Sequence, residues 1–328
     1  MGYNRENFKR IRAEYETKAF RAEEEAENRR QELYEAVPPL RELDARLSAV
    51  GLQMLQVAMK QEDVAAGVQR LREENQRILC ERAELLRKNG FPADYTEPQY
   101  ECDRCRDTGY VGVRMCDCMR RRLMEAGMES SGLSGLLRKQ TFENFSLDFY
   151  RSDPAIYRRM SENYRNVYRY AHNFSIEPGK PMPSSLFFIG KTGLGKTHLS
   201  TAVAGVVISR GYDVFYNSAV GMLSDFESRR FGNGLASGGS DDTTRYIDCD
   251  LLMIDDLGTE VINQFTLSCL YYVLNTRLNL QKPMIISTNL KSGELERNYG
   301  DRIASRLMGE FQLIPFLGED IRKQKAEK

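Results

Sequence analysis

The feature that most constrains this chain is a short apolar run, residues 186–189, that leads into the pattern G-x-x-x-x-G-K-T at Gly190–Thr197. Apolar residues at helical spacing follow as far as Arg210, so the sequence predicts strand, glycine-rich loop and helix in that order. Gly190 and Gly195 permit positive φ, which lets several backbone N–H groups converge on a phosphate chain at the positive end of the helix. An ordinary glycine turn is the alternative, and a second motif downstream argues against it.

Each residue of this loop is a candidate ligand for a phosphate chain. Lys196 has the reach to contact the β- and γ-phosphates of a nucleotide, and the Thr197 hydroxyl is a suitable ligand for Mg²⁺. We expect the following residues to contact the nucleotide: Gly190, Lys191, Thr192, Gly193, Leu194, Gly195, Lys196, Thr197 and His198.

Two further apolar runs end in polar side chains. Residues 251–254 are apolar and are followed by Asp255 and Asp256, while residues 284–286 lead to Asn289. The carboxyl end of a buried parallel strand is where α/β sheets bind ligands. We therefore expect Asp255 to hold Mg²⁺, Asp256 to orient a water, and Asn289 to bond the γ-phosphate or that water. An acidic turn and an ordinary loop asparagine are the alternatives.

Composition limits the classes of partner. The 328 residues suggest two or three domains, and 47 basic residues balance 47 acidic ones, so any nucleic-acid binding must depend on a local patch. No apolar run approaches the roughly 18 residues that cross a bilayer. The charged start has no signal-peptide core. We expect a cytoplasmic protein with no membrane partner, in which cysteines are thiols or metal ligands.

Four of the seven cysteines lie within seventeen residues in a C-x₂-C…C-x-C pattern: Cys102, Cys105, Cys116 and Cys118. Four thiolates suit a closed, structural Zn²⁺ site, because no position remains for a catalytic water. A cluster of free thiols is the alternative. Arginines nearby could contact a nucleic-acid backbone or only offset the charge of the thiolates and acids. We expect the remaining cysteines in the core: Cys80, Cys249 and Cys269.

The front of the chain is helical by pattern. Residues 4–35 alternate charges, which predicts a solvated helix with i,i+4 ion pairs, and Pro38 and Pro39 interrupt it. Apolar residues spaced by three and four over residues 40–85 predict an antiparallel two-helix hairpin, which packs within this protein or docks another one. We divide the chain into a helical region (1–97), a zinc knuckle (98–128), a linker (129–140) and an α/β domain (141–328).

A helix predicted at residues 218–231 ends in Arg229 and Arg230, which by pattern are a solvated helix end. The glycine- and serine-rich stretch Gly232–Ser240 predicts a mobile loop.

Together the motifs resemble the AAA+ ATPases of the DnaC/DnaI helicase-loader and IstB transposition-helper group. The likeness covers about residues 141–321, and it includes Gly190–Thr197, Ile254–Gly258, Ser287–Asn289, Gly300–Leu307 and Thr141–Phe145. It implies an α/β fold, a P-loop AAA+ (ASCE) parallel sheet, here preceded by an α-helical segment with a small Cys₄ zinc knuckle. The resemblance also implies that ATP and Mg²⁺ bind at Walker A and B, that Asn289 is sensor 1, that Arg306 acts as an arginine finger on a neighbouring subunit, and that Arg322 is a candidate sensor 2.

The resemblance further implies an ATP-dependent helicase loader that assembles with itself and holds a replicative hexameric helicase on single-stranded DNA. The helical front end with its knuckle is similar in architecture to loaders of the DnaI type. The helix at residues 218–231 also resembles, by its position, the DNA-contacting helix that initiator ATPases have there, which implies that Arg229 and Arg230 contact a DNA backbone. Asp256 stands where most AAA+ proteins have Glu, which implies slow hydrolysis. Three alternatives remain: an IstB-like transposition helper that binds duplex DNA, a small-molecule kinase, and a nucleotide-gated adaptor that hydrolyses nothing.

Overall fold

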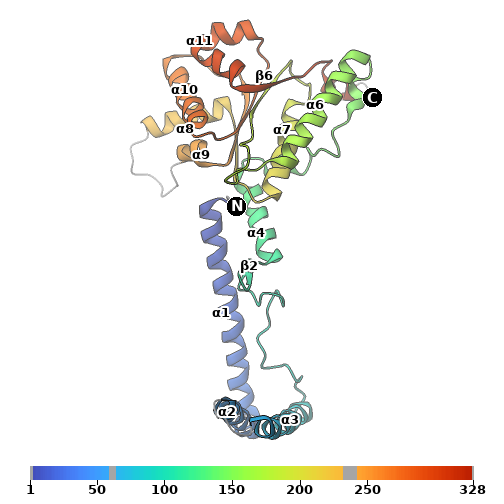
Figure 1. The fold of residues 1–328 in the computed structure, drawn as a ribbon, viewed down its shortest axis with the longest axis vertical. Helices are drawn as coiled ribbons and strands as arrows, with labels where there is room; N and C mark the ends of the chain where they lie inside the picture. The colour runs from blue at the N-terminus through green and yellow to red at the C-terminus, as the bar shows by residue number, and fades with distance from the viewer. Residues whose placement is uncertain (1–2, 59–63, 232–241, 327–328) are drawn as a thin grey trace. The chain divides into compact units, whose positions relative to one another are not determined.

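The computed structural model describes residues 3–58, 64–231 and 242–326, which fall into two compact units (Figure 1). The first unit is Met1–Ile11 with Met119–Lys328, and the second is Arg12–Cys118. The divisions fall within α1 (Arg5–Ala36) and near the start of α4 (Asp117–Ser130). None of the helices within the described ranges is long and apolar enough to cross a membrane.

The first unit is built on a sheet of five parallel strands in the order β4-β5-β6-β3-β7. The strands are β3 (Ser185–Ile189), β4 (Val214–Ser218), β5 (Leu251–Leu257), β6 (Met284–Thr288) and β7 (Phe311–Pro315). The expected α/β parallel sheet is therefore confirmed, and the strand that enters the glycine-rich loop lies between β6 and β7.

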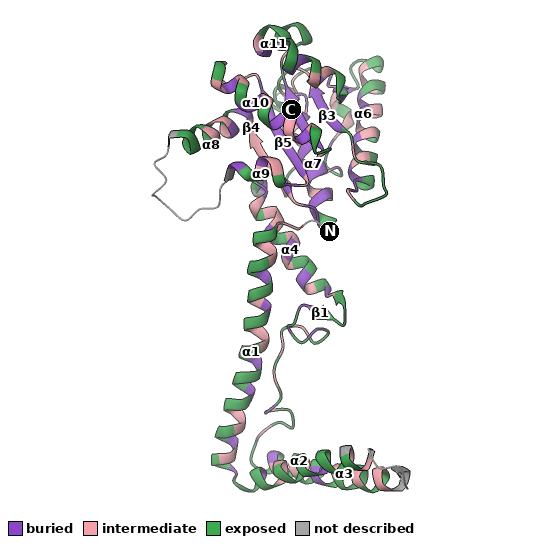
Figure 2. Ribbon diagram, turned by 60° about the vertical axis from the view of Figure 1, so that its left-hand side comes forward, coloured by how far each residue is buried: buried purple, intermediate pink, exposed green. Residues whose placement is uncertain are grey.

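The three inner strands, β5, β6 and β3, are mostly apolar and buried because helices cover both faces of the sheet (Figure 2). On β3, for example, Leu186 and Phe188 belong to one buried cluster and Phe187 to the other. One face packs against α6 (Pro154–Asn173) and α7 (Lys196–Ser209). The opposite face packs against α8 (Ala219–Phe231), α9 (Asp242–Asp248), α10 (Gln264–Asn279) and α11 (Ser292–Gly309). The first cluster also includes residues of η1 (Leu147–Tyr150) and, at its margin, α12 (Ile321–Ala326).

The segment at residues 129–140 packs against this unit. It contains the end of α4 and the short helix α5 (Ser134–Leu137), and both Ser131 and Leu133 are buried. The Tyr216 backbone N–H donates to the Ser131 carbonyl at 2.9 Å, and Arg245 Nη1 donates to the Ser130 carbonyl at 2.7 Å. The segment therefore lies alongside the edge strand β4 and is hydrogen-bonded to it. The loop expected at Gly232–Ser240 lies outside the described residues.

The second unit is mostly helical. α1 ends at Ala36, two residues before the first of the paired prolines, and α2 (Pro39–Ala58) and α3 (Val64–Lys88) pack against each other as the predicted hairpin. In their core, Leu40 and Leu86 meet Leu33 of α1. Arg82 in the seam is matched by Asp44, with Nε and Oδ1 2.6 Å apart and both side chains largely buried.

α1 is less solvated than its charges suggest. Arg12 and Glu16 form one of the expected i,i+4 ion pairs, at 3.0 Å. A stripe of apolar residues on the same helix is nevertheless buried, including Tyr15, Ala22 and Leu33. Burial raises the pKa of Tyr15, and the nearby thiols of Cys118, Cys105 and Cys102 raise it further, so this face of the helix covers the cysteine cluster. The prediction of a solvated helix is thus wrong for one face.

The side chain of Arg277 on α10 aligns the beginnings of two strands. It is completely buried, at 0% exposure. Its Nη1 donates to the carbonyls of Tyr246 and Cys249 at 3.1 and 3.0 Å, and Nη2 donates to the Pro283 carbonyl at 2.8 Å. Because Cys249 lies just before β5 and Pro283 just before β6, one guanidinium fixes the strands that carry the candidate polar residues.

We expect Arg277→Met to lower the free energy of unfolding by about 3 kcal/mol, because several buried carbonyls lose their donor. Urea unfolding followed by circular dichroism measures this change. The matched control is Arg297→Met on the exposed face of α11, for which we expect a change within about 0.5 kcal/mol. Equal destabilisation by the two variants would contradict the role given to Arg277.

Candidate functional site

A cavity of about 200 Å³ lies at the carboxyl end of β3, over the start of α7. Its lining comes from the segment 140–149, from residues 192–198, from Asp256 and from the last described helix, α12. The structure therefore brings together most of the loop residues expected to contact a nucleotide, with Asp256 and Arg322 among them.

The loop geometry requires glycine at two points. Gly195 has φ of 83° and caps α7, and a Cβ there would lie 3.0 Å from a ring carbon of Phe145. A Cβ at Gly190 would lie 2.4 Å from the carbonyl oxygen of Phe316. Larger residues at either position would displace the loop, so the glycines that define the motif are explained by close packing as well as by backbone conformation.

Lys196 is buried at the start of α7, and its ammonium group faces back into the loop. Nζ donates to the carbonyls of Gly190 and Lys191 at 2.7 and 2.9 Å. Burial lowers the pKa of Lys196, and the carboxylates of Asp256 and Asp255 partly offset this effect. The cation is thus positioned between the loop that could receive phosphates and the two acids of β5.

Asp255 accepts three hydroxyl hydrogen bonds. Thr197 Oγ1 and Tyr216 Oη donate to Asp255 Oδ2 at 2.9 and 3.0 Å. The Ser287 hydroxyl donates to Oδ1. The structure thus places Thr197 beside Asp255, as a shared Mg²⁺ site requires, and the donors come from α7, β4 and β6.

The side chain of Asp256 points away from this cluster and lines the cavity. Its φ is 54°, in the left-handed region, and its backbone N–H donates to Ser287 Oγ at 3.0 Å. Burial, and then the neighbouring Asp255 charge, raises the pKa of Asp256. Lys196 and Arg322 oppose the rise and favour the carboxylate form. This arrangement suits a group that accepts a hydrogen bond from a water molecule in the cavity.

The other candidate polar residues lie in different places. Arg322 lines the cavity from α12, which is held there by a hydrogen bond from the Ile321 N–H to the Gly193 carbonyl at 3.0 Å. Asn289 is exposed just after β6. Arg306 lies on α11, with its guanidinium 5.4 Å from the ring centroid of Tyr271. Neither Asn289 nor Arg306 is among the described residues that line the cavity.

Several site residues had not been identified from the sequence. Tyr216 and Ser287 bond Asp255, and the Tyr150 hydroxyl donates to the Leu194 carbonyl at 2.8 Å, which supports the loop. Ser287 lies at the polar end of an apolar run, and this pattern could have identified it from the sequence.

His198, which the sequence did predict as a site residue, packs edge-on against Phe145 with the ring centroids 5.2 Å apart. Burial lowers the pKa of its imidazole.

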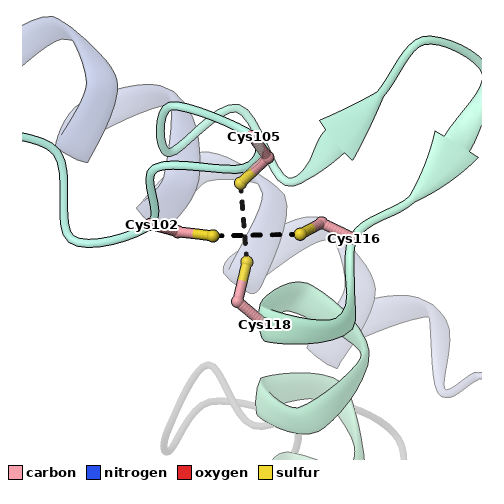
Figure 3. Close-up of side chains that lie close together, drawn as sticks. All are labelled: Cys102, Cys105, Cys116 and Cys118. Carbon is pink, nitrogen blue, oxygen red and sulfur yellow. Dashed lines mark hydrogen bonds between the residues drawn. The ribbon is translucent and has the colours of Figure 1, made fainter.

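The four clustered cysteines converge in the second unit (Figure 3). The Sγ atoms of Cys102 and Cys116 are 3.9 Å apart, those of Cys105 and Cys118 are 3.5 Å apart, and all four lie within 4.8 Å of one another. Zinc–sulfur bonds of about 2.3 Å in a tetrahedron require sulfurs about 3.8 Å apart. The donor set and spacing therefore fit Zn²⁺.

The backbone around the cluster prepares it for thiolates. A hydrogen bond from the Cys105 N–H is the main reason that the pKa of Cys102 falls to about 7. Burial has the opposite effect on Cys105 and raises its pKa to about 12, so a bound cation would be needed to ionise this thiol. A short hairpin returns the chain to the second pair of cysteines: β1 (Tyr110–Val111) pairs antiparallel with β2 (Arg114–Met115).

The surroundings of the cluster are partly neutralised. Arg104 Nη1 lies 2.7 Å from Asp117 Oδ2. For this arginine the ion pair agrees with the alternative in which the arginines offset nearby acids.

The remaining cysteines differ in their exposure. Cys249 and Cys269 are buried, as expected, whereas Cys80 is exposed, so its assignment to the core was wrong. Cys80 lies on the solvent-facing side of α3.

Known proteins similar to this chain include an ATP-binding protein family and two helicase loaders. Residues 182–328 match the family model of the IstB-like ATP binding protein. The replicative helicase loader DnaC of Buchnera aphidicola subsp. Baizongia pistaciae is 25% identical over 210 residues, which cover 61% of this chain and 76% of that protein. DnaC of Escherichia coli K12 is 25% identical over 186 residues, covering 56% and 69% of the two chains.

One further relative and one solved structure complete the comparison. The phage-like element PBSX protein XkdC of Bacillus subtilis 168 is 27% identical over 213 residues, covering 61% of this chain and 75% of that protein. A crystal structure of the DnaC helicase loader aligns with 54% of this chain and 98% of its own, at 22% identity and a TM-score of 0.43. The DnaC relatives and the IstB-like family match confirm the resemblance found in the motifs.

We expect Tyr216→Phe to weaken Mg²⁺-dependent nucleotide binding about fivefold, because Asp255 loses a hydrogen bond worth about 1 kcal/mol. Titration of Mg²⁺ against a fluorescent ATP analogue measures the shift. Tyr170→Phe is the matched control, since the Tyr170 hydroxyl is buried without a hydrogen-bond partner in the described structure. An unchanged Mg²⁺ requirement in Tyr216→Phe would contradict the positioning of Asp255 by this hydroxyl.

We expect the purified protein to contain about one zinc per chain and Cys105→Ser to lose most of it, because three thiolates leave the tetrahedral shell incomplete. Elemental analysis by mass spectrometry provides the measurement. Cys80→Ser should retain full zinc content, since Cys80 is outside the cluster. Equal zinc content in all three proteins would show that the cluster is not the site.

Proposed function

We propose that this chain, whose residues 182–328 match the IstB-like ATP binding protein, is an ATP-dependent loader that holds a replicative helicase on single-stranded DNA and releases it on hydrolysis. The observation that supports the ATP switch best is the convergence of Lys196, Thr197 and Asp255 beside one cavity. The names of the DnaC relatives support the choice of helicase as partner.

Nucleotide binding would use groups that are already in place. Lys196 would exchange the carbonyls of Gly190 and Lys191 for the β- and γ-phosphate oxygens. Thr197 and Asp255 would hold Mg²⁺, which neutralises phosphate charge when bound. The backbone N–H groups of the loop and of the first turn of α7 would receive the remaining phosphate oxygens. Phe145 and Phe149, which also line the cavity, are suitable for contact with the base.

Hydrolysis would depend on Asp256. Its side chain lines the cavity and lies within the fields of Lys196 and Arg322, which favour the carboxylate that orients a water on the γ-phosphate. The side chain is one methylene shorter than the Glu of most AAA+ proteins, which is consistent with slow turnover. A slow reaction suits a timed switch, in which loss of the γ-phosphate removes contacts and releases a partner.

Assembly would complete the site. Arg306 is outside the cavity of its own chain, which leaves it available to a neighbouring subunit's nucleotide in an ATP-dependent assembly. Asn289, exposed after β6, would contact the γ-phosphate or water only after a local movement. Arg322 lies on α12, whose first N–H bonds the Gly193 carbonyl, so changes at the phosphates would reach α12 directly.

The front half of the chain would dock the helicase. The α2–α3 hairpin and the zinc knuckle (98–128) are outside the residues 182–328 that match the family model. In this proposal Zn²⁺ has a structural role, since four thiolates leave no position for a reacting water.

One observation favours a second candidate function: the matched family model is IstB-like. A transposition helper would use the same ATPase to bind duplex DNA and a transposase. The two candidates differ in partner and not in nucleotide chemistry, so partner retention separates them.

The test is co-purification with the cognate replicative helicase, with and without ATP. We expect the wild type to retain helicase in ATP and Lys196→Ala to retain at least about tenfold less, because it loses contacts to the β- and γ-phosphates. Lys180→Ala is the matched control, since Lys180 is exposed and paired with Glu177. Failure of the wild type to retain helicase, together with ATP-dependent binding of duplex DNA, would favour the transposition helper.

A further inference from the structure

The outer face of α6 carries an aromatic row beside a cationic row, and neither has a part in the ATPase mechanism described above. Tyr164, Tyr168 and His172 are spaced by four residues, and so are Arg165 and Arg169. Residues four apart lie on the same side of a helix, about 6 Å apart along its axis, so the two rows run side by side. We call this face the α6 platform.

The aromatic row is ordered by its own contacts. Tyr168 stacks on His172 with centroids 4.0 Å apart and an interplanar angle of 24°. Tyr164 and Tyr168 are 6.2 Å apart at 28°, and Phe142 supports Tyr168 edge-on at 5.1 Å. Tyr168 is nevertheless 40% exposed, which is unusual for a large ring with so many aromatic neighbours. The rings therefore form a pre-organised surface rather than a closed core.

The cationic row adds positive charge beside the rings. Arg165 and Arg169 are exposed, and Arg165 forms no ion pair within the described residues. Arg169 Nη2 donates to the neutral amide oxygen of Asn166 at 2.6 Å and keeps its charge uncompensated by that contact. The cationic row is thus available to an anionic ligand.

Acidic groups nearby do not cancel this charge. Glu162 is shared by Arg158 and Arg159, with N···O distances of 3.4 and 3.8 Å. Glu143 faces Tyr164 and His172, where its pKa is lowered mainly by a hydrogen bond from Thr141. The helix as a whole carries four arginines against one glutamate.

The platform is hollowed. A depression of about 850 Å³ is lined by Glu162, Tyr164, Arg165, Asn166, Tyr168 and Arg169. A second, of about 400 Å³, shares Asn166 and Arg169 and reaches Ser184 and Gln312 near the starts of β3 and β7. The shared residues make the two depressions neighbours along α6, which suits an extended ligand better than a compact one.

We propose that the α6 platform binds single-stranded nucleic acid, with bases stacked against the Tyr168 and His172 rings and phosphates paired with Arg165 and Arg169. Rings beside arginines are the usual means of binding unpaired strands, because every base has a π-face and every nucleotide a phosphate. Duplex DNA hides its base faces within the helical stack and meets only half of these requirements. The binding is independent of the ATPase, whereas its use in helicase loading rests on the function proposed above.

Fluorescence anisotropy of a labelled 20-mer of thymidines, with the full chain and no nucleotide, tests the proposal. We expect Tyr168→Ala to weaken binding about tenfold, which is within the range measured for loss of one stacked base. Tyr168→Phe should retain most of the affinity. The double variant Arg165→Ala with Arg169→Ala should reduce the salt dependence of binding by about 1.4 in log–log slope, since about 0.7 is lost per phosphate contact.

Matched controls separate the platform from general effects. Tyr272→Ala removes an exposed ring on α10, and Arg297→Ala removes an exposed arginine on α11; both should bind like the wild type. Wild-type affinity in Tyr168→Ala and in the double arginine variant, or equal competition by duplex DNA, would overturn the proposal. Because the arginines are exposed, their double variant tests the site even if Tyr168→Ala is unstable.

The same variants distinguish this inference from the loader function. Retention of helicase by a platform variant that no longer binds the oligonucleotide supports a separate strand site. Normal oligonucleotide binding by the platform, in a wild-type protein that retains no helicase, would refute the loader function and leave this inference supported.

Discussion

A hydrogen bond from Thr197 Oγ1 to Asp255 Oδ2 joins two segments that are 58 residues apart in the sequence. It can form because β3 and β5 both flank β6 in a parallel sheet, so that the loop after β3 and the acid of β5 share one edge. Lys196 is next to Thr197 in the sequence, and Asp256 is next to Asp255. The hydrogen bond therefore also positions Lys196 and Asp256. Without this alignment, the loop and the acids would be separate surface features.

The parts predicted well from the sequence are those fixed by local pattern. Apolar runs bounded by turns predicted β3, β5 and β6, because a strand covered on both faces by helices has few polar residues. The loop motif specified the position of Lys196, since strand, glycines and helix follow one another directly. The cysteine spacing predicted convergence at Cys102 and its three companions for the same reason, as two short turns joined by a hairpin bring four thiols together.

The parts that were missed depend on register between distant elements. Tyr216 reaches Asp255 because Ser218 pairs with Asp255 in the β4–β5 ladder, and no local pattern around Tyr216 reveals that pairing. The buried stripe of α1 is missed because its partners lie elsewhere in the sequence, near Cys118 for Tyr15. Cys80 was misplaced because a helix in a two-helix hairpin buries only one side, and periodicity alone leaves its phase open.

The attachment of α12 to the glycine-rich loop has a practical consequence. The Ile321 N–H bonds the Gly193 carbonyl, and a Cβ at Gly193 would overlap the Asp320 carboxylate, so the final helix and the loop occupy one tightly fitted space. Arg322 and Lys325 of the same helix line the cavity. Any occupant of the loop would alter the environment of this helix at once. The fluorescence of a dye attached to its exposed side, for example at Lys323, would therefore report whether the glycine-rich loop is occupied.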